Sequence, residues 1–287
     1  MILLIRWFIR HHRSRNTSSE KVRGARTSHN GVLSLVLHQA RYDLLGFLRN
    51  KQARFFTLLL PVAFLVILVG LFGNHIVGSE HVKASTYYVP GLSAMAVIAA
   101  SFVNLVISIT TQRESGVLKR RRATPVPAWV LIAGRALTAM AVSLATMSVV
   151  MVIGRFAYGA DLPVRTIPAV ALTAIVGSIA FCVLGYALSS LIGSADAAQP
   201  IVQATMLPLY FISGVFVPDV SLPSWLQHIA EFFPVEHLAG GLHHAYDPAV
   251  RGIGIAWSDL GVLALWMVAG LVIALRRFRW TPAAAAA

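Results

Sequence analysis

The chain alternates between long runs of apolar residues and short polar segments. Six of the apolar runs are each close to the roughly 20 residues that a helix needs to cross a membrane. These runs lie at residues 55–72, 87–110, 128–154, 167–192, 197–217 and 254–275. The pattern therefore predicts six transmembrane helices, which with the segments between them form one membrane domain over residues 55–279.

A helix of another kind is expected before the first run, over residues 31–54. Its apolar residues recur every three or four positions and form one stripe: Leu33, Val36, Leu37, Ala40, Leu44, Phe47 and Leu48. The segment also carries basic residues, so we expect an amphipathic helix that lies along the membrane surface. Leu35, Tyr42 and Leu45 fall outside the stripe. They either contact a protein partner or pack under the bundle, and the pattern leaves both open.

The segment at residues 218–253 is too apolar for a polar loop and too short for two crossings. Two short helices that dip into the membrane, at about residues 223–233 and 234–246, fit it best. Each would begin with a proline, which suits the first position of a helix. Residues 1–30 are rich in Ser, Thr, Arg and Gly and are expected to form a flexible basic arm, and residues 280–287 a short tail.

Composition agrees with a membrane protein. The chain of 287 residues is 57% hydrophobic and 12% charged, whereas a soluble domain carries roughly 25% charged residues. The fold class expected from pattern and composition is an all-α polytopic membrane protein with six transmembrane helices, the interface helix and the two short outer helices.

The net charge of +13 could indicate nucleic-acid binding, but the placement of the charges favours another explanation. Residues 1–54 hold eleven of the 24 Lys and Arg residues, residues 111–127 hold five, and residues 276–279 hold three. Basic residues that border transmembrane helices mark the cytoplasmic side. An even number of spans puts both termini there, so we expect a multi-pass protein of the cytoplasmic membrane that contacts lipids and no nucleic acid.

The sequence shows no motif for cofactor binding or catalysis. It lacks the phosphate-binding pattern G-x-x-x-x-G-K-[ST], so no nucleotide or other cofactor is expected in this chain. The lone Cys182 lies in an apolar run and is expected to serve packing. Asp196 and Asp259 lie near opposite ends of the membrane, too far apart for an intramembrane protease, so we expect no enzyme. Asp196 is expected to cap the fifth helix, and Asp259 to pair spans or line a path.

Four neighbouring residues invite a metal site, namely Glu236, His237, His243 and His244. Their spacing matches no common zinc motif. We therefore expect no metal here and interpret them as polar tips of an amphipathic helix. Arg135 lies two turns into the third span, close enough to the cytoplasmic end for its side chain to reach the membrane surface.

The basic loop at residues 111–127 carries the most specific motif. Residues 113–120 read RESGVLKR and residues 122–127 read RATPVP, which resembles a loop of ABC type-2 exporter permeases. Two further stretches, PLYFISGVFVP at residues 208–218 and the segment at residues 223–237, resemble the fifth span and outer helices of that family. The resemblance covers about residues 31–279 and is greatest to drug exporters of the daunorubicin-resistance kind.

The resemblance implies the permease subunit of an ABC exporter. A separate ATPase subunit would bind ATP and Mg²⁺, and a second permease, identical or homologous, would complete the transporter. It further implies that the loop and the interface helix contact the ATPase, through Arg113, Glu114, Gly116 and Leu118 and through Leu35, Tyr42 and Leu45. Lys119 departs from the Glu that many members carry.

The residues of the loop suit such a contact. Glu114 would favour a short helix that follows it, Gly116 would permit close backbone approach, and Thr124-Pro125 would end the helix. The plainer alternative is that the basic residues only hold the loop inside. The nearly uncharged spans suit an amphiphilic drug-like or lipid-like substrate. A lipid or glycan exporter of the same family and a membrane scaffold or sensor without transport remain the alternatives.

Overall fold

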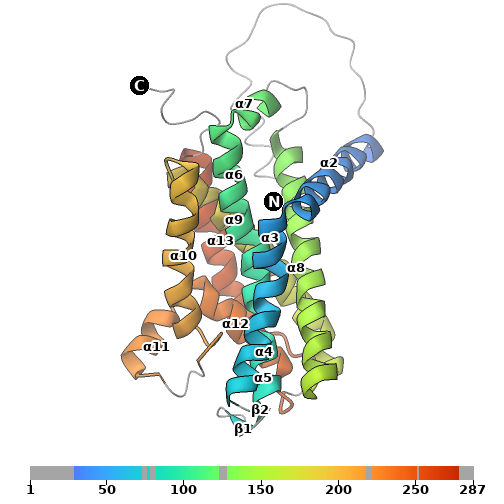
Figure 1. Cartoon of the computed structure of the whole chain (residues 1–287), viewed down its shortest axis with the longest axis vertical. Helices are drawn as coiled ribbons and strands as arrows, with labels where there is room; N and C mark the ends of the chain where they lie inside the picture. Colours follow the sequence, from blue (N-terminus) through green and yellow to red (C-terminus); the bar gives the residue numbers. More distant parts are fainter. Residues whose placement is uncertain are drawn as a thin grey trace, which may run out of the picture.

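The computed structural model describes residues 29–72, 76–77, 82–122, 128–217, 222–250 and 252–277. Within these residues the chain is almost entirely helical, and the long helices run side by side as one bundle (Figure 1). The expectations for the arm before His29, for Thr124-Pro125 and for the tail at residues 280–287 concern positions outside the described residues.

Five helical stretches in the described part of the chain are long and apolar enough to cross a membrane. The first combines α3 (Lys51–Arg54), the π-helical turn η1 (Phe55–Leu59) and α4 (Leu60–Phe72). The second combines α5 (Ala84–Ile98), the π-helical turn η2 (Ala99–Val103) and α6 (Asn104–Glu114). The others are α8 (Ala128–Tyr158), α9 (Ile167–Leu191) after the 3₁₀ turn η3 (Val164–Thr166), and α13 (Trp257–Arg277). The expected fold class, an all-α polytopic membrane protein, is confirmed.

The fifth predicted span, residues 197–217, corresponds to α10 (Ala195–Ile212). This helix has 18 residues, includes the polar Gln199 and Gln203, and is not among the five apolar stretches. It runs beside α6 along the bundle (Figure 1). A sixth crossing therefore stays a prediction.

A π-helical turn widens the start of the first span. The backbone N–H of Leu60 donates to the carbonyl of Phe55, five residues earlier. Pro61 follows directly, and its ring cannot donate a hydrogen bond and would clash with the carbonyl of Thr57 in a regular helix. The widened turn accommodates the proline without ending the helix.

The second span is the core of the bundle. In its most apolar stretch of 18 residues, 78% is buried, whereas only 17% of the corresponding stretch of α13 is buried. The second span packs against α4, α8, α9 and α12. Gly91 of α5 allows the turn after α10 to come close, because a Cβ at that position would lie 2.9 Å from the carbonyl oxygen of Val215. The more exposed helices, such as α13, form the outside of the bundle.

The interface helix predicted at residues 31–54 corresponds to α2 (His29–Arg49), which packs across α8 (Figure 1). Its predicted end is wrong, because the side chain of Asn50 caps α3 and so begins the first span there. The two backbones come close at Gly134, where a Cβ would lie 2.6 Å from Cγ of Gln39. The hydroxyl of Thr138 donates to the carbonyl of Ala40 at 3.0 Å. The position of α2 in a membrane interface stays a prediction, but its attachment to α8 is defined by these contacts.

The end of the bundle opposite α7 (Val117–Arg122) holds the short elements. The helices α11 (Ser224–Ala230) and α12 (Pro234–Tyr246) occupy the segment where two short helices were expected. The loop between the first two spans contains a small antiparallel hairpin of β1 (Ile76–Val77) and β2 (Val82–Lys83), which the sequence pattern did not predict. Two-residue strands carry too little alternation to be recognised.

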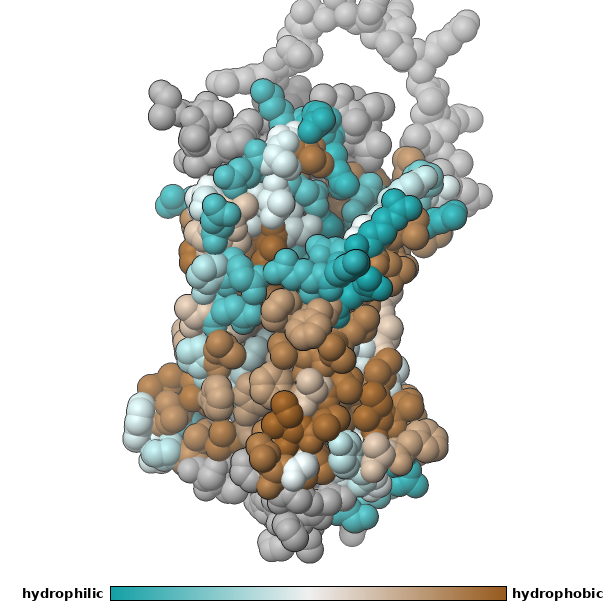
Figure 2. Space-filling model, in the orientation of Figure 1, coloured by the Kyte–Doolittle hydropathy of each residue, from teal (hydrophilic) through white to brown (hydrophobic). Residues whose placement is uncertain are grey.

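The surface divides along the axis of the bundle. Figure 2 shows mainly hydrophobic residues over the middle and lower part of the visible face. Hydrophilic residues gather around α7 and along the region of α2 and α3. This division is typical of a protein whose lower and middle part lies in lipid, while the α7 end is in contact with water.

Candidate functional site

The candidate site is the turn between α6 and α7, where the family-like motif lies. Gly116 ends α6 in a left-handed conformation with φ of 70°, and its backbone N–H donates to the carbonyl of Arg113 at 3.2 Å. This is the usual role of a glycine just after a helix. A Cβ on Gly116 would meet no atom within 4 Å. Within the described chain the glycine therefore serves backbone conformation, and the close approach expected toward a partner stays a prediction.

Arg113 is buried and turned toward the C-terminal end of α9. The residue is only 5% exposed. Its guanidinium donates hydrogen bonds to the carbonyl oxygen of Ser189, at 2.9 Å, and to that of Ile192. The last carbonyls of a helix have no partner within the helix and carry its negative dipole end. The guanidinium of Arg113 both donates hydrogen bonds to these carbonyls and places a positive charge at the negative end of α9.

Glu114 binds the start of α10, the helix that follows α9. Its carboxylate accepts a 2.6 Å hydrogen bond from the backbone N–H of Ala195, the first residue of α10. The N-cap of α10 is Ser194, whose hydroxyl accepts from the backbone N–H of Ala197 at 3.3 Å. The prediction that Asp196 caps this helix is therefore wrong, because Asp196 already lies inside the first turn.

Arg113 and Glu114 together bind both ends of the connection between α9 and α10. We call them the Arg113–Glu114 clamp. Arg113 binds the carbonyls where α9 ends, and Glu114 binds an N–H where α10 begins. Each side chain has the charge that the adjoining helix end favours. A displacement of the α6–α7 turn would therefore act directly on α9 and α10.

Leu118 holds α7 against the bundle. It is 4% exposed and packs in a cluster with residues of α6, α8 and α9, namely Leu105, Ile109, Ala139, Cys182 and Tyr186.

The burial of Leu118 leaves no surface for the ATPase contact that we expected of it. The neighbouring Lys119 and Arg120 are exposed, as are Leu35, Tyr42 and Leu45 on α2, with exposed fractions of 41%, 59% and 38%. Anchoring and exposed residues are thus separated on α7.

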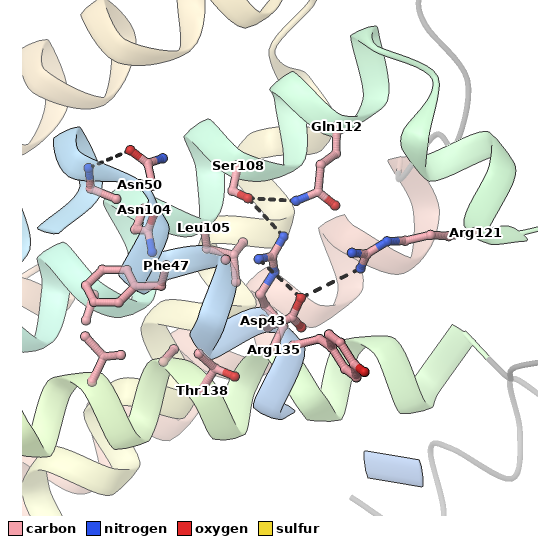
Figure 3. A pocket seen from close by; sticks show the side chains of 16 residues that line it. Asp43, Phe47, Asn50, Asn104, Leu105, Ser108, Gln112, Arg121, Arg135 and Thr138 are labelled. Carbon is pink, nitrogen blue, oxygen red and sulfur yellow. Dashed lines mark hydrogen bonds and ion pairs between the residues drawn. The ribbon is translucent and has the colours of Figure 1, made fainter. Parts of the chain in front are cut away.

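A buried acidic residue connects α2 to α7 and α8 (Figure 3). Asp43 of α2 is 6% exposed, and its Oδ1 lies 3.8 Å from NH1 of Arg121 on α7 and of Arg135 on α8. Arg135 also donates to the hydroxyl of Ser108 on α6 at 2.9 Å. Its guanidinium is thus directed into the protein instead of toward the membrane surface. The group borders a cavity of about 220 Å³ between α2, α6 and α8.

Sequence reasoning missed Asp43, and the pattern held a signal for it. Asp43 lies three positions after Ala40 and four before Phe47, inside the apolar stripe of the helix. An acidic residue on a buried helix face requires a partner. That requirement could have directed attention to Arg121 and Arg135, although the choice between basic residues depends on how the helices pack.

A second polar group lies at the opposite end, where α12 meets α13. Nδ1 of His237 is 2.8 Å from Oδ1 of Asp259, and its Nε2 is 2.7 Å from the carbonyl oxygen of Glu231. The hydrogen bond with Asp259 raises the pKa of His237 above its ordinary value. Asp259 therefore joins α13 to the short helix α12, rather than to another span.

The histidines of α12 do not form one group. The ring of His243 packs at a tilt against Tyr87 of α5, with ring centroids 4.6 Å apart, and its Nε2 lies 3.2 Å from the carbonyl oxygen of Gly214. Burial lowers the pKa of His243 to about 4. His244 is exposed. Of the four residues considered for a metal site, only Glu236 and His237 lie together.

Comparisons with known proteins agree with the motif in the α6–α7 turn. The family model for the ABC-2 type transporter matches residues 36–246. The chain is 25% identical over 175 residues to the probable multidrug ABC transporter permease YbhR of Escherichia coli K12, covering 61% of this chain and 47% of that protein. It is 21% identical over 236 residues to the putative transport permease YvfS of Bacillus subtilis, a match that covers 82% of this chain and 94% of that protein.

A further relative has a named resistance role. The daunorubicin resistance ABC transporter permease protein DrrB1 of Streptomyces coeruleorubidus is 26% identical over 215 residues, which cover 75% of this chain and 73% of that protein. The match to YbhR spans about half the length of that relative. The matched region includes α2 from residue 36 onward, the clamp, and both short outer helices.

Proposed function

Because the chain belongs to the ABC-2 type transporter family, whose members are membrane transport subunits and not enzymes, we propose that it is the permease of an ATP-driven exporter. Its substrate is an amphiphilic, drug-like or lipid-like molecule. A separate ATP-binding-cassette subunit binds ATP and Mg²⁺ and hydrolyses the nucleotide, and this chain holds no cofactor of its own. The names of the multidrug and daunorubicin-resistance relatives support the substrate class.

The α7 end of the bundle is the cytoplasmic side in this proposal. The exposed Lys119 and Arg120 lie there, and Arg276 and Arg277 end α13. Basic residues at the ends of spans favour the cytoplasmic side. The membrane is then the cytoplasmic membrane, with both termini inside and with α11 and α12 on the outside.

The ATPase contacts a surface made by two elements. One part is the exposed side of α7 with Lys119 and Arg120, and the other is the exposed side of α2 with Leu35, Tyr42 and Leu45. Asp43 connects the two elements through Arg121. This connection supports a single docking surface in which α2 and α7 move together.

The observation that carries the proposal is the Arg113–Glu114 clamp. When the ATPase subunits close on ATP and displace α7, the clamp transmits the displacement to the ends of α9 and α10. Glu114 thereby acts as a positioning residue for α10. Leu118 prevents α7 from sliding independently, because it is packed among residues of the bundle.

The substrate path lies between two permease copies, identical or homologous. The described spans carry few charges, which suits an apolar or amphiphilic molecule. Exposed apolar side chains on the first span and on α10, including Leu59, Ile67, Leu207 and Phe211, can face the second copy or lipid. The alternative function, a membrane scaffold without transport, would require neither a second permease copy nor an ATPase subunit.

Co-purification with the ATPase subunit and substrate-stimulated ATP hydrolysis test the proposal. Glu114→Lys removes the acceptor for Ala195 and brings a positive charge to the positive end of α10. We expect the variant to insert and to bind the ATPase, while stimulation of hydrolysis by substrate is lost. Normal export by Glu114→Lys would contradict the coupling role, and the absence of any ATPase partner would contradict the transporter itself.

A further inference from the structure

Three side chains with metal-binding atoms meet between α12 and α13, at the end opposite the clamp. Glu236 and His237 lie near the start of α12, and Asp259 lies in the first turn of α13. Nδ1 of His237 is 2.8 Å from Oδ1 of Asp259 and 3.5 Å from Oε2 of Glu236. One ligand atom from each residue lies within 4.8 Å of the others.

The other ring nitrogen of His237 determines how the imidazole is oriented. Its Nε2 lies 2.7 Å from the backbone carbonyl oxygen of Glu231, which can only accept a hydrogen bond. With one proton on Nε2, Nδ1 faces the two carboxylates, where a metal ion can take the place of the second proton. Histidines that bind metals commonly donate their second N–H to a backbone carbonyl or a carboxylate in this way.

A cation placed between the three side chains would be attracted by both carboxylates. Two carboxylates this close repel one another, and a positive charge between them offsets the repulsion. A proton on Nδ1 would neutralise one carboxylate, whereas a divalent ion would neutralise both. The side chains of Glu236, His237 and Asp259 are 23%, 13% and 20% exposed, so the group is not enclosed by the protein.

We infer that Glu236, His237 and Asp259 bind a divalent transition-metal ion of the Zn²⁺ type. One nitrogen and two carboxylate oxygens suit Zn²⁺ and its neighbours in the first transition row. Ca²⁺ takes six or more oxygen ligands, and Mg²⁺ is bound in octahedral oxygen sites, so both fit this group poorly. Three protein ligands leave a fourth tetrahedral position for water.

The ion joins a short outer helix to a long one. Trp266 of α13 also binds the turn before α12, because its Nε1–H donates to the carbonyl of Phe232 at 3.0 Å. Bound metal would replace the hydrogen bond between His237 and Asp259 with coordination by all three side chains, and would thereby strengthen the connection between the starts of α12 and α13. The ion therefore holds the outer helices in place, a role that does not depend on the transport proposal.

Zinc uptake by the purified full-length protein tests the inference. The protein in nanodiscs is stripped with a chelator, incubated with ZnCl₂ and desalted, and the zinc bound per chain is measured by elemental mass spectrometry. We expect one ion fewer in Asp259→Asn and in His237→Gln than in the wild type. Competition with a coloured chelator should show why the ion is lost, because removing a ligand should weaken its binding by more than the roughly tenfold that loss of a residue orienting a ligand costs.

His244→Gln is the matched control, because His244 is exposed on the same helix and lies outside the group. It should retain the full zinc content. A loss of zinc in this control would mean that histidines outside the group also bind the ion. Thermal unfolding of the metal-free proteins shows whether each variant folds, and Zn²⁺ should raise the unfolding temperature only where the site is intact. Equal zinc content in the wild type and Asp259→Asn overturns the inference. Stabilisation that follows pH but not Zn²⁺ also overturns it, because the group then takes only a proton.

Discussion

Glu114 accepts a hydrogen bond from the backbone N–H of Ala195, a residue 81 positions further along the chain. Its neighbour Arg113 donates to the carbonyls of Ser189 and Ile192 at the end of the preceding helix. Two consecutive residues of α6 thus bind both sides of the connection between α9 and α10. These two residues of the family-like motif are therefore part of the packing of the bundle.

Substitutions at Glu114 should separate hydrogen bonding from charge. Glu114→Gln keeps an acceptor for the N–H of Ala195, whereas Glu114→Ala removes it, at a cost on the order of 1 kcal/mol for a helix end. We expect substrate-stimulated ATP hydrolysis to decrease in the order wild type, Gln, Ala, Lys. Steady-state hydrolysis in nanodiscs with the ATPase subunit measures it.

Asp196→Lys is the control for this series. Asp196 is exposed in the first turn of the same helix, so its reversal affects the helix dipole without breaking the contact to α6. It should impair stimulation less than Glu114→Lys does. If both reversals had the same effect, the dipole of α10 and not the clamp would explain the result.

The buried carboxylate of Asp43 should couple energetically to Arg135. Their atoms lie 3.8 Å apart, and the side chains are 4% and 17% exposed. A double-mutant cycle with Asp43→Asn and Arg135→Gln should give an interaction free energy of about 1 kcal/mol. Unfolding in mixed micelles with increasing SDS measures the apparent free energy of unfolding.

A surface pair at the same distance gives the comparison. Arg155 and Asp161 are also 3.8 Å apart, but their side chains are 49% and 63% exposed. Solvent screens such a pair, so its cycle should give roughly zero to 0.5 kcal/mol. A value for Asp43 and Arg135 no larger than this would show that burial adds nothing to their interaction.

Gly134→Ala should detach α2 from α8. The added Cβ would lie 2.6 Å from Cγ and 2.9 Å from Cβ of Gln39, so the helices must separate. Overpacking of this kind costs roughly 1–3 kcal/mol. We expect a lower unfolding temperature and weaker co-purification with the ATPase subunit. Gly70→Ala on α4, where a Cβ meets nothing within 4 Å, should leave both unchanged.

The protein should lose stability in acid through His243. Its pKa is about 4 in the folded protein because the ring is buried, against roughly 6.5 in an unfolded chain. The unfolded state therefore takes up the proton first, so the contribution of His243 is complete above pH 6.5 and declines as the pH falls toward 4. The unfolding temperature measured between pH 7.5 and 4.5 should follow this decline.

His243→Gln isolates that contribution from other titrating groups. The amide can still donate to the carbonyl of Gly214 but does not titrate. His237, whose pKa is raised, acts in the opposite direction, because it stabilises the fold at low pH and loses that effect as the pH rises. The difference between the wild type and His243→Gln should shrink in acid. A constant difference would contradict the assignment to His243.

Local pattern determined most of the helices. The runs at residues 128–154 and 167–192 became α8 and α9, and the helix expected at residues 234–246 has those bounds in the structure. A span or a proline-initiated helix is encoded by consecutive residues, since hydropathy and backbone restriction act locally. The motif at residues 113–120 similarly indicated the family without any knowledge of the packing.

The partners of the polar residues were decided only by the tertiary structure. Arg113 and Leu118 were expected at an ATPase contact, yet both are buried within the bundle. Arg135 was expected to reach the membrane surface, yet it lies beside Asp43. Hydropathy shows that a segment is a helix, but the rotation of that helix and its neighbours determine which side chains meet. These quantities depend on contacts between residues far apart in the chain, which no local pattern contains.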